Sequence, residues 1–189
     1  MSSFEYVTVL ISIILGLGIA EILTRIARLI QKRKKVILYW PHMLWIIFIL
    51  FLHIQEWWLM YELKNYQPWR LPVFLFIMLY PVNLFVLAKL IFPDTSRGKA
   101  IDLKAFYFAN YPEIFLLLVA SALLSITYNL LILNLKFSDQ VLQILLVTSF
   151  TVVILKKYPH EWLHKSLSLA VTVIMLATII FEWDVWLIN

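Results

Sequence analysis

A histidine and a carboxylate one helical turn apart are the side chains of this sequence best placed to exchange protons. His53 and Glu56 are three residues apart, and Gln55 lies between them. Residues three or four apart share a face of an α-helix, so His53 and Glu56 can meet if this stretch is helical. An imidazole changes charge near neutral pH, which makes such a pair a candidate for proton or cation transfer.

Asn83 and Glu21 are two further candidates for such a path, and each also has a structural interpretation. Pro81 should kink its helix and free the carbonyl of Ile77, which the Asn83 amide is near enough to satisfy. Glu21 precedes Arg25 by four residues, the favourable order for an ion pair within a helix. The choice between path and packing depends on where the elements place these side chains.

Sets of residues typical of catalysis or of metal binding are missing from the sequence. The chain has no cysteine, which excludes disulfides and thiolate metal sites. His160 and His164 are four residues apart with Glu161 between them, but they do not have the His-Glu-x-x-His order of a zinc protease. There is no nucleophile elbow and no phosphate-binding loop. We therefore predict no enzyme activity, no metal and no cofactor.

The composition is that of an integral membrane protein. Hydrophobic residues make up 63% of the 189 residues, charged residues make up 14%, and the mean hydropathy is +0.89. Soluble domains are about 45–50% apolar and about 25% charged. A soluble globule of this length has too little interior to bury so much apolar surface, so the lipid bilayer must be the main partner.

Six stretches are long and apolar enough to cross a bilayer, which takes about 20 residues of helix. They predict an all-α, polytopic membrane helix bundle that forms a single domain over residues 1–189. Residues 101–108 either form a short helix on the membrane surface or extend the fourth span. Three spans are expected to begin with an aromatic residue, a proline and a titratable residue: Trp40-Pro41-His42, Tyr111-Pro112-Glu113 and Tyr158-Pro159-His160. The predicted spans are 4–30, 37–61, 71–92, 112–135, 139–155 and 163–188.

The basic residues predict the orientation of these spans. Six alternating spans place Lys64, Arg70 and Lys136 on one side of the membrane. The remaining basic residues lie on the other side. By the positive-inside rule the side with more lysine and arginine is cytoplasmic, so both termini should lie on the non-cytoplasmic side. The cytoplasmic loops should attract anionic lipid, whereas four basic residues between two spans leave no room for a nucleic-acid interface. The cytoplasmic side carries the other thirteen lysine and arginine residues: Arg25, Arg28, Lys32, Arg33, Lys34, Lys35, Lys89, Arg97, Lys99, Lys104, Lys156, Lys157 and Lys165.

The first span carries small residues at every fourth position. Small side chains at this spacing allow two helices to approach closely in lipid. The pattern predicts either that this span is the most buried of the bundle or that it forms a seam with another copy or a membrane partner protein. The stripe consists of Thr8, Ser12, Gly16, Ala20 and Thr24.

The first half of the sequence resembles a family of small bacterial polytopic inner-membrane proteins of unassigned function. The resemblance is carried by the segments 4–10 and 14–19, by Trp40-Pro41-His42, by 53–58 and by 90–94. It implies a multi-pass protein of the bacterial inner (plasma) membrane, and it supplies no activity and no site residues.

Two functions from different classes remain open. One is a small channel or carrier for protons or cations, whose path includes Glu56, His53, Asn83 and Glu21, because ionisable groups inside spans are functional candidates. The other is a non-transporting membrane subunit or scaffold that binds a partner protein, with Glu56 in the headgroup layer. They differ in whether these side chains converge on an interior cavity.

Overall fold

The computed structural model describes residues 2–94 and 100–181 of the chain. In these ranges six helices are long and apolar enough to cross a membrane, two of them with the help of an adjoining 3-10 turn. The predicted all-α bundle with six candidate membrane spans is therefore confirmed. The helices are α1 (Ser3–Gln31), α2 (Trp40–Leu59), α3 (Leu71–Leu90), α4 (Leu103–Leu131), α5 (Val141–Lys156) and α6 (Glu161–Phe181).

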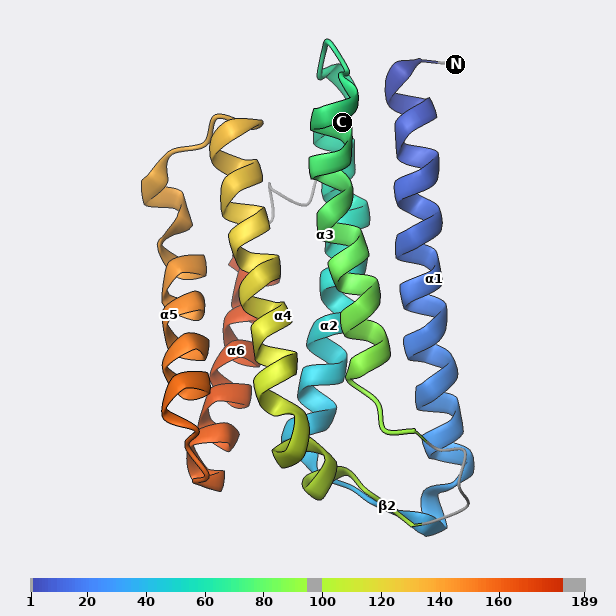
Figure 1. Cartoon of the computed structure of the whole chain (residues 1–189), viewed down its shortest axis with the longest axis vertical. Helices are drawn as coiled ribbons and strands as arrows, with labels where there is room; N and C mark the ends of the chain where they lie inside the picture. The colour runs from blue at the N-terminus through green and yellow to red at the C-terminus, as the bar shows by residue number, and fades with distance from the viewer. Residues whose placement is uncertain (1, 95–99, 182–189) are drawn as a thin grey trace.

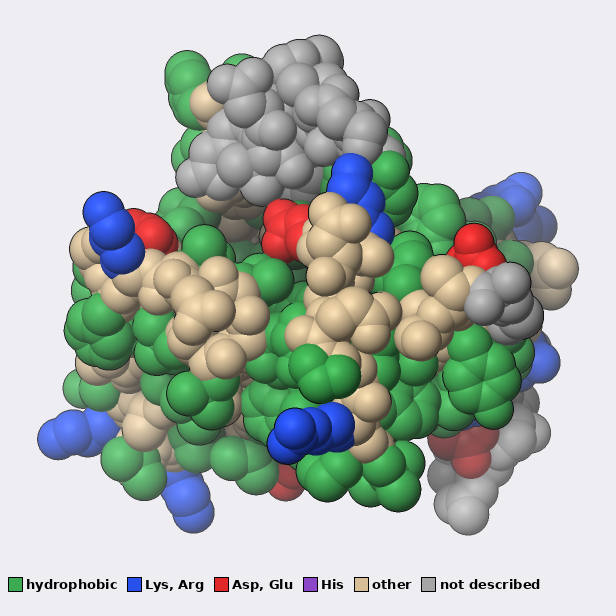
Figure 2. All heavy atoms as spheres, turned by 90° about the horizontal axis from the view of Figure 1, so that it is seen from above, with side chains coloured by type: hydrophobic (Ala, Val, Ile, Leu, Met, Phe, Trp, Pro, Cys, Tyr) green, Lys and Arg blue, Asp and Glu red, His purple; other side chains and the backbone are tan. Residues whose placement is uncertain are grey.

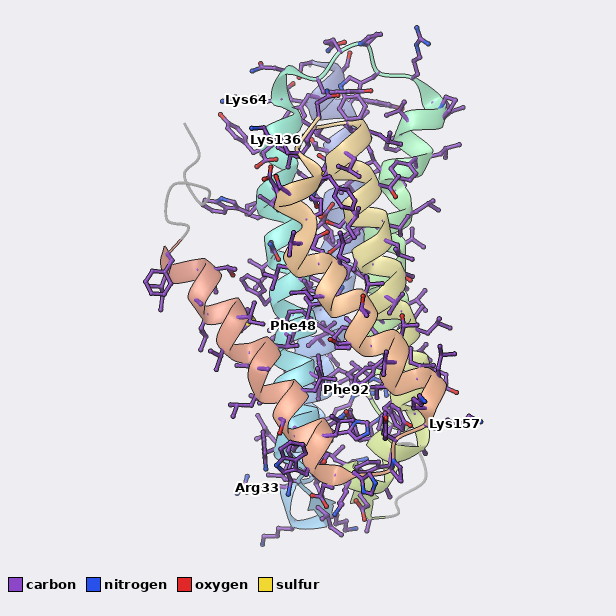
Figure 3. All side chains as sticks on the ribbon, turned by 90° about the vertical axis from the view of Figure 1, so that its left-hand side faces the viewer. Arg33, Phe48, Lys64, Phe92, Lys136 and Lys157 are labelled. Carbon is purple, nitrogen blue, oxygen red and sulfur yellow. The ribbon has the colours of Figure 1, made fainter. Side chains whose placement is uncertain are left out.

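The six helices run alternately up and down in a single bundle (Figure 1). Helix α2 packs against α1, α3, α4 and α6, whereas α5 is held mainly by α4. Arg33 and Lys157 lie at one end of the bundle, which we call the basic end, and Lys64 and Lys136 lie at the opposite end (Figure 3). Of the thirteen basic residues predicted for one side, Arg97 and Lys99 lie outside the described residues, and the other eleven lie in the half toward the basic end.

The two loops at the basic end that flank α2 and α4 are joined by a short parallel β-pair. Strand β1 (Val36–Ile37) pairs with β2 (Ile101–Asp102), and Val36 lies opposite Ile101. Asp102 then caps α4, because its carboxylate accepts the backbone N–H groups of Lys104 and Ala105. The β-pair thus fixes the starting points of α2 and α4 relative to each other.

The largest correction to the predicted spans concerns α4, which begins at Leu103 instead of residue 112. Residues 103–108 extend the fourth span, so the alternative of a separate surface helix is wrong. Pro112 therefore lies inside the helix and does not start it. The expected pattern holds for α2, where Pro41 lies in the first turn, but Pro159 and His160 precede α6, which begins at Glu161.

Smaller corrections apply to the other predicted limits. Residues 37–39 belong to the strand and the loop before α2, and α2 continues as a 3-10 turn over Met60–Asn65. Helix α3 ends at Leu90, and a 3-10 turn over Phe137–Gln140 precedes α5. Residues 182–188 of the predicted sixth span lie outside the described residues.

The lateral surface of the bundle is apolar, as a protein surrounded by lipid requires. Only 17–28% of each candidate span is buried inside the chain, and large hydrophobic side chains such as Leu155 (76% exposed) and Leu131 (73% exposed) point outward. Seen from the opposite end, most of the visible surface is hydrophobic or uncharged (Figure 2). Burial in lipid, and not in a protein core, accounts for most of the apolar composition.

Candidate functional site

A cleft of about 330 Å³ lies between α2, α4, α5 and α6. It lies where α6 leans away from the other helices toward the opposite end (Figure 3). Tyr80 of α3 completes the wall between α2 and α4. We call this cavity the cleft. Its volume is at the lower end of the range of small-molecule sites.

Two carboxylates line the cleft, that of Glu56 on α2 and that of Asp139 before α5. Tyr80 and Ser125 line the cleft beside Glu56, and the same three side chains border a second, smaller cavity together with Tyr128. That cavity holds about 20 Å³, enough for roughly one water molecule. Among the described residues, no lysine, arginine or histidine forms an ion pair with Glu56. The alternative that placed Glu56 in the headgroup layer stays a prediction.

The rest of the polar wall comes from α4 and α5. The Gln143 amide of α5 donates to the Ser125 hydroxyl at 3.2 Å, and its side-chain oxygen is buried with no hydrogen-bond partner in the described chain. Near the opposite end, Asn129 donates to Gln140 at 2.8 Å. Asp139 lies at the mouth, where its carboxylate caps the 3-10 turn by accepting from the Lys136 N–H and the Ser138 hydroxyl. The polar groups therefore lie toward the opposite end of the cleft.

The deep end of the cleft is closed by aromatic rings. Phe48 and Phe150 line it there, and Phe48 lies near the middle of the bundle (Figure 3). The Phe150 ring stacks on Phe115 with centroids 4.9 Å apart and meets the edge of Trp45 at 5.6 Å. Trp45, Phe115 and Phe150 are all at most 2% exposed. These three rings separate the cleft from the basic end.

Further aromatic and histidine rings fill the bundle between this floor and the basic end. Tyr107 packs against His42 and against His164, with centroids 5.8 Å and 5.4 Å apart. His164 in its neutral form accepts from the Tyr107 hydroxyl at Nδ1 and donates from Nε2 to the Tyr158 carbonyl, both at 2.9 Å. Burial, with a smaller contribution from Glu161, raises the pKa of Tyr39 to about 12, so this phenol stays neutral. We call the group the aromatic cluster: Tyr39, His42, Tyr107, Tyr111 and His164.

The hydrogen bonds of His164 leave it unsuited to a metal. Both of its ring nitrogens are engaged, and Glu161 forms ion pairs with Lys104 and Lys165 at 2.5 and 2.8 Å. No group of three or more histidine and acidic side chains able to hold a metal ion occurs within residues 2–94 and 100–181. His160 and His164 therefore give no metal centre in this part of the chain.

His53 lies away from the cleft, on the side of α2 that faces α1. Its Nδ1–H donates to the Ile49 carbonyl at 2.8 Å, and its ring lies directly against Gly18. The side chain is fully buried. No hydrogen bond or ion pair in the described chain joins His53 to Glu56, so the structure does not bring the two predicted partners together.

Asn83 connects α3 to α4 and does not line the cleft. Its amide donates to the Leu117 carbonyl at 2.9 Å and to the Ser121 hydroxyl at 2.8 Å. The suggestion that it satisfies the carbonyl freed by Pro81 is replaced by this link between helices. Ser121 lines the cleft, so Asn83 contributes to the cleft wall only by orienting that hydroxyl.

We expect Asn83→Ala to lower the free energy of unfolding by about 1 kcal/mol, since hydrogen bonds between membrane helices contribute about 0.6 kcal/mol on average and at most about 1.7. Denaturant titration of the purified protein in mixed micelles measures the change. Asn110→Ala is the matched control, because the Asn110 amide bonds only to the Phe106 carbonyl of its own helix. An equal loss in both variants would contradict the link between α3 and α4.

Glu21 is engaged in a structural ion cluster. Its carboxylate contacts Arg25 at 2.8 Å in the predicted helical pair, and it also reaches Lys89 of α3 at 3.1 Å. These contacts hold the basic ends of α1 and α3 together. The structural interpretation of Glu21 therefore agrees with its contacts.

The small-residue stripe of α1 faces away from the bundle. Thr8 and Ser12 are half-buried, and Gly16, Ala20 and Thr24 are exposed. A side chain added at Gly16 would meet nothing within 4 Å. The stripe is therefore not the buried face of α1, although the candidate span in α1 is 28% buried, as much as those in α2 and α3. The other alternative, a seam with a second copy or a partner protein, stays a prediction.

Several cleft residues were missed because they do not look reactive in sequence. Tyr80 and Gln143 carry no motif, and they border the cleft only because α3 and α5 meet α4 on either side of Ser125. One signal was present: Ser121, Ser125 and Asn129 recur at every fourth position of α4, which marks a polar helix face.

Comparison of the chain with known proteins gives no significant match to a family model, to a curated protein or to a solved structure. The function is therefore argued from the geometry of the cleft.

Proposed function

We propose that the protein is a carrier for protons or cations that enter the cleft from the opposite end and bind at Glu56. The observation that supports this most is a carboxylate inside a cavity of a membrane helix bundle with no basic side chain of the described chain paired to it. A carboxylate at such a position is costly unless a proton or another cation neutralises it. His53, Asn83 and Glu21 do not belong to this path.

The closed floor of the cleft favours a carrier over a channel. A channel needs a continuous path, whereas Phe150, Phe115 and Trp45 close the cleft at its deep end. A carrier requires a site that is open to one side at a time, and the helices then rearrange to open the other side. In this proposal the structure corresponds to the state open toward the opposite end.

We also propose an orientation and a membrane. The basic end faces the cytoplasm of a bacterial cell and contacts anionic lipid of the inner membrane, so that the cleft opens outward. The segregation of the basic residues supports this orientation.

The test is ion flux into liposomes that contain the purified chain. Wild-type protein should pass protons or a monovalent cation down a gradient, and Glu56→Gln should lower the rate about tenfold or more, because an amide binds no proton and carries no charge. A pH-sensitive dye inside the liposomes measures the proton flux, and cation flux is measured in parallel.

The matched control is Glu113→Gln, the same chemical change at an exposed position of α4 in the half toward the basic end. This variant should keep the wild-type rate within about twofold, because Glu113 does not line the cleft. Equal losses of flux in the two variants would contradict a role for Glu56 in the path. Wild-type flux no greater than that of empty liposomes would contradict transport.

The outward-facing stripe of α1 favours a second candidate, a non-transporting subunit that binds a membrane partner or a second copy. The open space beside Gly16 is what a closely approaching helix requires. Absence of flux would favour this candidate over the carrier.

A further inference from the structure

The shape and lining of the cleft indicate which class of cation it accepts. Thirteen of its 21 lining residues are hydrophobic, including Phe48, Phe51 and Phe150. A proton or a bare metal ion gains no favourable contacts from a largely apolar cleft of about 330 Å³. Such a space suits a molecule with an apolar body.

The charge of the cleft is separated from its apolar part. Glu56 and Phe48 are eight residues apart on α2, which corresponds to about 12 Å along the helix axis. The amide and hydroxyl groups of Gln55, Ser125 and Gln143 lie in the part that contains Glu56, and the rings of Phe48 and Phe150 lie at the deep end. A ligand that fits both parts carries its positive group at one end and its apolar group at the other.

The donors around Glu56 favour an ammonium over a metal ion. A dehydrated cation such as Ca²⁺ needs six to eight oxygen ligands, and Mg²⁺ needs a near-octahedral set. Glu56 is one carboxylate, the Asp139 carboxylate caps a turn at the mouth, and no metal-binding group of side chains occurs in the described chain. A quaternary ammonium needs no such ligands, since a carboxylate and the faces of aromatic rings such as Tyr80 can bind it.

From these observations we infer that the cleft binds a monovalent organic cation, with its ammonium group at Glu56 and its apolar group against Phe48 and Phe150. This inference rests on the proposed carrier function, because it names the class of cation carried. It assigns the ligand by charge, size and polarity, and these three properties can be varied separately.

The experiment uses the purified full-length chain in detergent and benzyltrimethylammonium as the probe. Binding is measured by calorimetric titration and by the shift of the thermal unfolding midpoint. Wild-type protein and Glu113→Gln should bind the probe equally, whereas Glu56→Gln should bind at least tenfold more weakly. Neopentylbenzene, the neutral compound of the same shape, should show no difference between wild-type protein and Glu56→Gln, and the same concentration of K⁺ should not compete with the probe.

A second variant tests the apolar part without changing charge. Ala122 lines the cleft on α4, so Ala122→Phe should fill it and weaken probe binding at least tenfold while Glu56 remains in place. Circular dichroism and the unfolding midpoint without ligand establish that each variant is folded.

The outcomes separate the ligand class from transport. Probe binding that is equal in wild-type protein and Glu56→Gln overturns the inference, as does K⁺ that displaces the probe. Glu56-dependent proton or K⁺ flux without probe binding overturns the organic cation and retains the carrier. Glu56-dependent probe binding without flux of any cation, the probe included, retains the binding site and overturns the carrier.

Discussion

Gly18→Ala should lower the free energy of unfolding by about 2–3 kcal/mol, because the added methyl group overfills a tight contact between helices. A Cβ atom at residue 18 would lie 2.3 Å from Nε2 of His53 and 2.5 Å from its Cδ2. The His53 ring cannot easily move, since it is fully buried and its Nδ1 is bonded to the Ile49 carbonyl. Either α1 moves away from α2 or the histidine gives up this hydrogen bond. Denaturant titration in mixed micelles measures the loss.

Gly16→Ala is the matched control, two residues away on the same helix and next to open space. It should leave the stability of the single chain unchanged or raise it by up to about 1 kcal/mol, because alanine has the higher helix propensity. In a His53→Ala background the cost of Gly18→Ala should largely disappear, since the ring it meets is gone. A cost that persists in that background would mean that the contact with His53 is not what requires glycine.

Phe150→Ala should cost about 2–3 kcal/mol in stability and should open the floor of the cleft. The ring is 2% exposed and packs against Phe115 and Trp45. Its removal leaves a void and ends two aromatic contacts, each of which contributes about 0.5–1.5 kcal/mol. The loss is smaller than the cost of about 3–5 kcal/mol usual for soluble proteins, because the unfolded chain keeps its apolar groups in lipid. The same micelle titration measures it.

Phe137→Ala provides the comparison, because Phe137 is 65% exposed in the 3-10 turn before α5. That variant should change the stability by less than about 0.5 kcal/mol. In liposomes, Phe150→Ala should also raise passive proton leak above wild type, since the barrier between the cleft and the aromatic cluster is thinned. Unchanged stability in Phe150→Ala would contradict the packing of the floor, and unchanged leak would place the barrier nearer the basic end.

The number of spans could be predicted from the sequence because lipid leaves a chain few options. Every backbone polar group must be bonded inside the bilayer, so each apolar stretch of sufficient length forms a helix. The limits were less predictable where local signals conflicted. Pro112 is typical of a first turn, yet α4 begins at Leu103, where Asp102 supplies the cap and β2 pairs with β1. A pairing between residues 36 and 101 cannot be seen in either segment alone.

The candidate site was predictable only in part. The spacing of residues along a helix indicates which of them share a face, but it does not indicate which other helix packs against that face. His53 and Glu56 are three residues apart, which turns the helix by about 300° and leaves them about 60° apart around its axis. That angle is enough to direct His53 toward Gly18 of α1 and Glu56 into the cleft. Likewise, the α1 residues at every fourth position from Thr8 face outward, whereas Gly18, which lies off that stripe, makes the close contact.

The amino-acid sequence by itself determined the class of the protein, the six apolar helices and the separation of basic residues toward one end, since these depend on composition and on local hydrophobicity. Only the tertiary structure decided which polar side chains face one another. In the tertiary structure, Glu56 lines the cleft with Tyr80, Ser125 and Gln143, and Phe150 closes its deep end. His53, Asn83 and Glu21 instead make contacts between helices. The physical reason is that such a cleft is made by several helices whose mutual rotation and tilt are set by packing along their whole length, and no single segment records that packing.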